Sequence, residues 1–145
     1  MNKYIKGLCL LFFIIYVAIL AYMMLFSFSR LPREGYSYNL VPFTTIKTFM
    51  NFKHFNTDIW VINLIGNVGV FIPLGILLPI LLRYKWFTSY IVFLCIIAVL
   101  ELAQLLTRRG SLDIDDFILN SVGFFIGYLL YKLVRSYYHK KKRLK

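Results

Sequence analysis

The chain has 145 residues, of which 60% are hydrophobic and only 16% are charged, so it has too few polar side chains to cover a soluble domain. Its net charge of +11 would suit nucleic-acid binding, but the densest basic cluster, residues 135–145, directly follows an apolar block. Lys and Arg beside an apolar block are typical of membrane proteins, which keep them on the cytoplasmic side next to anionic lipid headgroups. The composition therefore argues against a soluble domain and against a nucleic-acid partner.

Four apolar blocks are long enough to cross a bilayer as helices, at about residues 7–28, 59–82, 88–107 and 117–134. The first begins like a signal peptide, but it is too long and lacks a small-x-small cleavage site, so we expect a retained anchor. In the second, Pro73 is expected to kink the helix. The two cysteines lie in apolar blocks, where we expect them to pack rather than to form a disulfide.

The segment between the first two blocks, about residues 29–58, is expected to form an outer loop. Residues 39–43 are expected to be extended, because the proline among them disfavours helical geometry at the preceding residue. Residues 44–52 carry apolar side chains at i, i+3 and i+4, which predicts a short interfacial helix capped by Thr44 or Thr45. The sequence thus predicts a single all-α integral membrane domain over residues 1–145, a bundle of about four transmembrane helices with a short interfacial helix.

The basic residues predict the orientation of the helices. Most of the 17 Lys and Arg residues lie at the N-terminus, in the loop between the second and third blocks, and at the C-terminal end. Positively charged loops stay in the cytoplasm. We therefore expect a multi-pass protein of the cell membrane with both termini cytoplasmic.

Polar side chains inside the apolar blocks carry the functional information, because they are costly in a bilayer. On the expected topology they all fall in the outer half of the membrane, and they come from three different blocks. They are Asn63, Asn67, Glu101, Gln104 and Asn120. Their shared depth predicts a polar pocket between the second, third and fourth helices that opens outward.

Structural alternatives stay open for these residues. Glu101 is the most costly of them, and it would be stabilised either by a ligand or by an ion pair with Arg108 or Arg109 that holds the third helix in place. The amides have an equally simple role, since side-chain amides join membrane helices through hydrogen bonds.

Three carboxylates, Asp113, Asp115 and Asp116, precede the fourth block. Asp113 is expected to be the N-cap of the fourth helix, with the other two in its first turn, where they complement the helix dipole. Together with Glu101 they could bind a hard cation, but their spacing matches no known calcium loop. We therefore expect neither a metal nor a cofactor.

A stripe along the fourth helix combines polarity with close packing. Gly123 and Gly127 have the Gly-x-x-x-Gly spacing that lets a helix approach its neighbour closely. At spacings of three and four residues they continue the face of Asp113, Asp116 and Asn120.

Several motifs, taken in order, resemble the VanZ-like family over about residues 39–131. They are Asn39-Leu-Val-Pro-Phe43, Asn63-Leu-Ile-Gly-Asn67, Phe71-Ile-Pro-Leu-Gly75, Glu101-Leu-Ala-Gln104, Arg109 to Asp116, Asn120, Gly123 and Gly127-Tyr128. The resemblance implies a membrane protein of several helices and makes Arg109, not Arg108, the arginine of the family motif. It also implies a link to teicoplanin-type glycopeptide resistance, and those antibiotics act on cell-wall precursors outside the membrane.

Residues and resemblance together suggest an outward-facing pocket for the polar headgroup of a lipid or a lipid-linked cell-wall precursor. Arg109 would meet a phosphate, and Glu101 or Asp116 would be the acid or base if a reaction occurs. The expected pocket residues are Asn39, Asn63, Asn67, Glu101, Gln104, Arg109, Asp113, Asp116 and Asn120. The alternative is a non-catalytic partner protein whose polar residues only pack the helices; a transporter component ranks last, because four helices without an inverted repeat are few.

Overall fold

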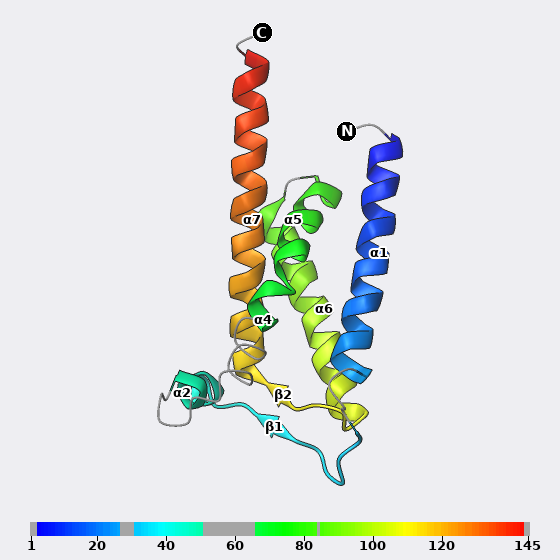
Figure 1. The fold of residues 1–145 in the computed structure, drawn as a ribbon, viewed down its shortest axis with the longest axis vertical. Helices are drawn as coiled ribbons and strands as arrows, with labels where there is room; N and C mark the ends of the chain where they lie inside the picture. The colour runs from blue at the N-terminus through cyan, green and yellow to red at the C-terminus, as the bar shows by residue number, and fades with distance from the viewer. Residues whose placement is uncertain (1–2, 27–30, 51–65, 84, 144–145) are drawn as a thin grey trace.

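The computed structural model describes residues 3–26, 31–50, 66–83 and 85–143. Its elements in chain order are α1 (Lys3–Phe26), β1 (Tyr38–Asn39), α2 (Thr44–Met50), α4 (Gly66–Gly69), α5 (Ile72–Leu81), α6 (Trp86–Leu106), β2 (Leu112–Asp113) and α7 (Ile114–Arg143). The long helices run side by side (Figure 1). Both chain termini lie at one end of this bundle, and β1, β2 and α2 lie at the other.

Three of the helices, α1, α6 and α7, are long and apolar enough to cross a membrane, and the stretch Gly66–Leu81 is a shorter apolar helical segment. The hydropathy of α1 is 2.8, and most of its apolar side chains point away from the protein. A helix that is apolar on all sides requires a lipid environment. The prediction of an all-α membrane protein is confirmed. The number of four spans stays a prediction, since residues 59–65 of the second block lie outside the described residues.

The second apolar block is interrupted where a kinked helix was expected. The described part forms α4, which ends at Gly69, and a separate helix α5, which begins at Ile72. Pro73 lies in the first turn of α5, where its missing N–H leaves no helical hydrogen bond unmade. At the break, the hydroxyl of Tyr16 on α1 donates to the carbonyl oxygen of Val70 at 2.7 Å.

The fourth predicted span covered only the apolar part of α7. The observed helix has 30 residues and begins at Ile114, directly after Asp113, which is its N-cap as predicted. It continues to Arg143 because Lys and Arg favour helices and stabilise a helix C-terminus.

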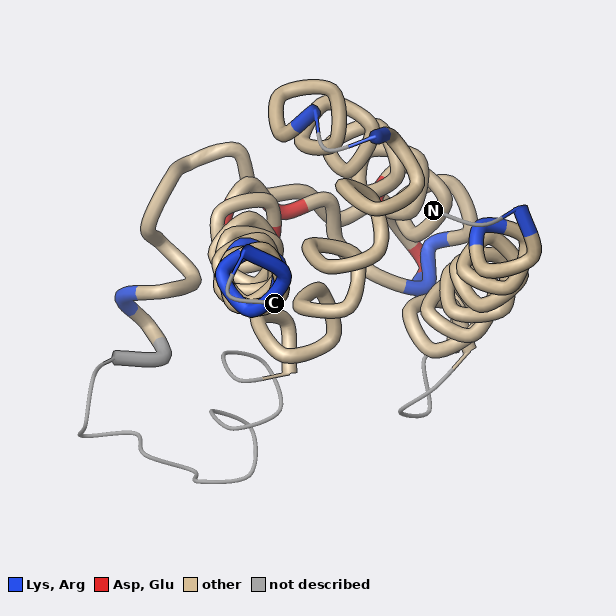
Figure 2. The backbone as a smooth tube through the Cα atoms, turned by 90° about the horizontal axis from the view of Figure 1, so that it is seen from above, with Lys and Arg blue, Asp and Glu red and all other residues tan. Residues whose placement is uncertain are grey.

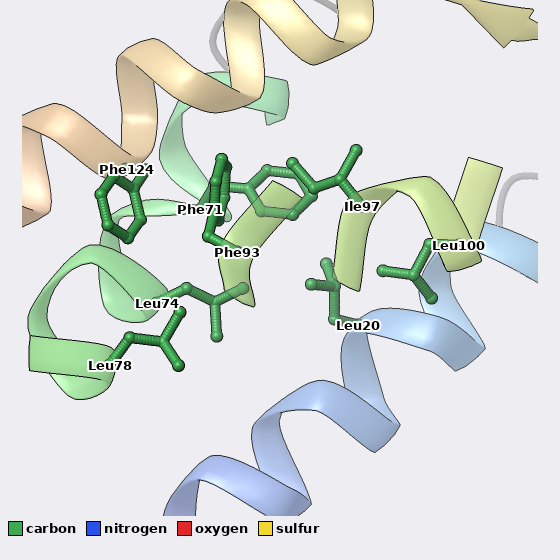
Figure 3. Close-up of a cluster of buried hydrophobic side chains, with 8 residues drawn as sticks. All are labelled: Leu20, Phe71, Leu74, Leu78, Phe93, Ile97, Leu100 and Phe124. Atoms are coloured by element: carbon green, nitrogen blue, oxygen red, sulfur yellow. The ribbon is translucent and has the colours of Figure 1, made fainter. Parts of the chain in front are cut away.

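Apolar side chains from four helices form the core, which lies between α1, α5, α6 and α7 (Figure 3). Phe93 of α6 and Phe124 of α7 pack against each other in this core, with ring centroids 4.5 Å apart. The buried core residues are Leu20, Phe71, Leu74, Leu78, Phe93, Ile97, Leu100 and Phe124.

Glycines allow α7 to pack directly on the backbone of α4 and α5. A Cβ atom on Gly123 would overlap the carbonyl oxygen of Val68, and one on Gly127 would overlap the carbonyl oxygen of Ile72. Only glycine permits so close an approach.

Two short strands join the loops at the other end of the bundle. β1 and β2 pair in parallel, with Tyr38 opposite Leu112 and Asn39 opposite Asp113. The expectation that residues 39–43 are extended is wrong beyond Asn39, because the chain turns there and Phe43 adopts a left-handed φ of 64°. Proline fixes its own φ in a way that suits such a turn.

Candidate functional site

Asp113 lies at the centre of a hydrogen-bonded cluster. Its Oδ1 accepts the backbone N–H of Asp115 at 2.9 Å, the N-cap contact of α7, and the side-chain amide of Asn39 at 3.2 Å. Its Oδ2 accepts the hydroxyl of Thr45 at 2.6 Å. One carboxylate thus starts α7 and attaches both β1 and α2 to it.

Asp115 caps a second helix. It is fully buried, and its carboxylate accepts backbone N–H groups from Phe43 at 2.6 Å, Thr45 at 2.7 Å and Ile46 at 3.1 Å. These are the N–H groups that the first turn of α2 leaves without a helical partner. The predicted cap from Thr44 or Thr45 is therefore wrong. The cap lies about 70 residues further along the chain, and no local sequence pattern indicates it.

Glu101 is buried beneath the junction of β2 and α7. None of its surface is exposed, and its Oε2 accepts the backbone N–H of Asp113 at 3.4 Å. This contact brings the most costly residue of α6 into the same cluster as Asn39 and Asp113.

The guanidinium groups of the two arginines after α6 lie over aromatic rings. Arg108 adopts a left-handed φ of 56°, which reverses the chain. Its guanidinium lies 5.1 Å from the ring centroid of Tyr36, and that of Arg109 lies 4.7 Å from the ring centroid of Phe26. Cations over aromatic rings are stabilised by about 0.5–1 kcal/mol at exposed sites.

Gln104 joins α6 to α1. Its side-chain amide is buried and donates to the carbonyl oxygen of Met24 at 2.8 Å, in the last turn of α1. That carbonyl is one of those that a helix C-terminus leaves unsatisfied. Gln104 therefore points toward α1, whereas the carboxylate cluster lies toward α7.

The boundary between α4 and α7, which we call the α4–α7 seam, carries Asn67, Asp116 and Asn120. The amide of Asn67 donates to Oδ1 of Asp116 at 2.7 Å. Asn120, one turn further along α7, is only 1% exposed, and no donor in the described part of the chain reaches its Oδ1. A buried amide oxygen left without a donor costs about 1–3 kcal/mol.

The structure thus divides the predicted site residues into three groups. Asn39 and Glu101 both contact Asp113, Asn67 and Asp116 form a pair with Asn120 one turn away, and Gln104 and Arg109 turn toward α1. Asn63 lies outside the described residues. Within the described ranges, no three His, Cys, Asp or Glu side chains are arranged to hold a metal ion.

Residues 13–135 match the family model VanZ/LLP1. The chain is also 33% identical to Protein VanZ of Enterococcus faecium over 107 residues, which cover 73% of this chain and 59% of that protein. The chain therefore spans about three-fifths of the length of this curated relative. No solved structure matches the chain. The family match covers every described element from the middle of α1 to the membrane part of α7, and the chain belongs to the VanZ/LLP1 family.

Proposed function

We propose that the protein contributes to glycopeptide resistance by recognising the polar headgroup of a lipid or a lipid-linked cell-wall precursor. Recognition takes place at the end of the bundle that carries β1, β2 and α2, which is proposed to face the outside of the cell. The resemblance to the VanZ-like family supports resistance of the teicoplanin type, because those antibiotics act on precursors at that membrane face.

The α4–α7 seam is the proposed recognition surface, and Asn120 is the observation that carries the proposal. Gln104 carries the other buried side-chain amide among the described residues, and it donates to the carbonyl oxygen of Met24. The amide oxygen of Asn120 is buried within a transmembrane helix with no donor among the described residues. Buried polar groups as a rule have a partner, so a ligand donor at this position would offset the cost.

Other polar groups at this end of the bundle complete the proposed site. The Asn67–Asp116 pair supplies a carboxylate and an amide one turn from Asn120, and both groups suit the hydroxyl and amide groups of a headgroup. Arg109 lies over the ring of Phe26, on the α1 side of the same end of the bundle. It is proposed to bind the phosphate, since a guanidinium matches phosphate oxygens in pairs. If the ligand is altered chemically, Glu101 or Asp116 is the proposed acid or base.

A non-catalytic structural role is the second candidate, and a specific observation favours it. Asn39, Asp113 and Asp115 each make hydrogen bonds to distant parts of the chain, and together they fasten β1 and α2 onto α7. On this alternative the polar residues only assemble the bundle, so resistance follows the amount of folded protein.

The test is a set of variants in a glycopeptide-susceptible bacterium, with teicoplanin resistance measured together with membrane abundance. We expect Asn120→Ala and Asp116→Asn to lose resistance at unchanged abundance. One hydrogen bond to a charged headgroup is worth about 1.5–3 kcal/mol, roughly a tenfold to hundredfold loss of affinity. Ser121→Ala is the matched control, because Ser121 faces Tyr90 of α6 instead.

Three results separate the candidates. Full resistance in Asn120→Ala and Asp116→Asn would contradict the proposed recognition surface. Resistance that falls only in proportion to abundance would support the structural role. Mass spectrometry of lipids and precursors from cells with and without the protein tests for a reaction, since an unchanged profile would leave recognition without chemistry.

A further inference from the structure

An apolar groove lies between α5 and α7, in the half of the bundle nearer the chain termini. Its volume is about 220 Å³. Each helix contributes side chains four residues apart, which share one face of a helix. The lining residues are Ile76, Ile80, Leu130, Tyr131, Val134 and Arg135.

The groove faces the lipid rather than the centre of the bundle. Leu130 and Val134, which line it, are 44% and 57% exposed, and both belong to the apolar part of α7. Around a transmembrane helix such exposed apolar surface meets acyl chains. A cavity of roughly 150 Å³ already holds a benzene molecule, so this groove has room for part of an acyl chain.

Arg135 is the charged residue among those that line the groove. Its guanidinium donates to the hydroxyl of Tyr131, one turn earlier on α7, at 3.1 Å. Tyr131 is only 8% exposed, so this contact fixes the guanidinium beside the apolar walls. Arginine binds phosphate through paired hydrogen bonds, and a fixed guanidinium loses less entropy when it does so.

The described charged residues around the groove are basic. Lys132 precedes Arg135 on α7, and Lys and Arg surround the C-terminal part of α7 and mark the nearby loop and N-terminus (Figure 2). The acidic residues that the structure describes all belong to the opposite end of the bundle. They are Glu34, Glu101, Asp113, Asp115 and Asp116.

We propose that this groove binds an anionic glycerophospholipid of the leaflet on the side of the chain termini. One acyl chain lies between α5 and α7, and the phosphate binds Arg135. The apolar walls select a chain, and the surrounding positive charge selects an anionic headgroup over a zwitterionic one. This lipid site is separate from the α4–α7 seam, which lies at the other end of the bundle.

Native mass spectrometry of the purified protein in neutral detergent tests the proposal. Equal amounts of phosphatidylglycerol and phosphatidylcholine with the same acyl chains are added as competitors. Both lipids offer a phosphate to Arg135, but only phosphatidylglycerol keeps a net negative charge. We expect the wild-type protein to retain phosphatidylglycerol roughly fivefold more, since the attraction of an anionic lipid to one basic residue is worth about 1 kcal/mol. Equal retention of the two lipids by the wild-type protein would overturn the proposal without any variant.

Two charge variants locate the headgroup. Arg135→Gln is expected to abolish the preference for phosphatidylglycerol. Lys47→Gln is the matched control, since Lys47 is an exposed cation of α2 at the opposite end of the bundle and does not line the groove. An equal loss in both variants would show a diffuse charge effect and would overturn the assignment to Arg135.

A groove-filling variant locates the acyl chain. Ile80→Trp is expected to reduce retention of both lipids while Arg135 remains in place. Val99→Trp, on an exposed face of α6, adds the same side chain outside the groove and is expected to retain lipid as the wild type does. Wild-type retention in Ile80→Trp would place the chain elsewhere and contradict the proposal.

Discussion

Asp115 stabilises the first turns of two helices, α7 and α2. It lies in the first turn of α7, where the helix dipole favours a carboxylate. The same carboxylate accepts the first N–H groups of α2, and thus completes a second helix N-terminus. The seven residues of α2 would be marginal as an isolated helix in water. Their position on α7 therefore depends on Asp115.

Replacing Asp115 by Ala should release α2. Three backbone N–H groups lose their acceptor, and losing a helix cap costs about 0.5–2 kcal/mol. We expect trypsin to cleave after the exposed Lys47 of α2 faster in Asp115→Ala than in the wild-type protein in detergent. Asp116→Asn, one residue further along α7, should leave the cleavage rate unchanged. A wild-type cleavage rate in Asp115→Ala would contradict the capping role.

The capping roles of Asp113 and Asp115 differ in how far the sequence could predict them. The N-cap role of Asp113 is local, because its side chain accepts an N–H two residues away, and the sequence pattern predicts it correctly. The capping of α2 by Asp115 joins positions about 70 residues apart. The contact of Glu101 with Asp113 joins positions only 12 residues apart, but it depends on how α6 and β2 meet. No periodicity reports such contacts.

At the scale of elements, glycines bring the backbones of α5 and α7 into direct contact. Gly75 on α5 and Gly127 on α7 lie against each other, and Gly123 lies against α4. The Gly-x-x-x-Gly spacing identified a face for close packing from the sequence alone. It could not identify the partner helix, because the same spacing suits any neighbour.

Gly127→Ala should separate α7 from α5. The added Cβ would overlap the carbonyl oxygen of Ile72, so the two backbones must move apart. Overpacking of this kind typically costs about 1–3 kcal/mol, and we expect a lower thermal unfolding temperature in detergent. Gly7→Ala is the control, because nothing lies within 4 Å of a Cβ at that position of α1. Equal unfolding temperatures for Gly127→Ala and wild type would contradict this packing.

Prolines explain why the second apolar block was harder to predict than the others. Pro73 indicates an irregularity in the sequence. Proline occurs both at kinks within a helix and in the first turn of a new helix, so it does not distinguish the two. The break becomes favourable because Tyr16 of α1 supplies a hydrogen bond to Val70 there. In a membrane, a backbone carbonyl needs such a partner, and only the folded bundle identifies it.

At the scale of the whole molecule, the two ends of the bundle differ in chemistry. The end with β1, β2 and α2 carries the carboxylates and the buried amides, and the end with the chain termini carries the basic C-terminal part of α7 (Figure 2). The sequence predicted this division from charge and hydropathy. Since basic residues stay in the cytoplasm, the division also predicts which end faces outward.

Cysteine labelling tests this orientation. In a variant with Cys9→Ala and Cys95→Ala, a single cysteine is introduced either at Glu34, beside β1, or at Lys142, near the end of α7. Both positions are exposed and belong to opposite ends of the bundle. An impermeant maleimide added to intact protoplasts should label Glu34→Cys and spare Lys142→Cys until the cells are opened.

Labelling of Lys142→Cys alone would show the opposite orientation, with the carboxylate end in the cytoplasm. The proposed recognition of an external headgroup would then fail, whereas the anionic lipid site at the basic end would still be tested by its own variants.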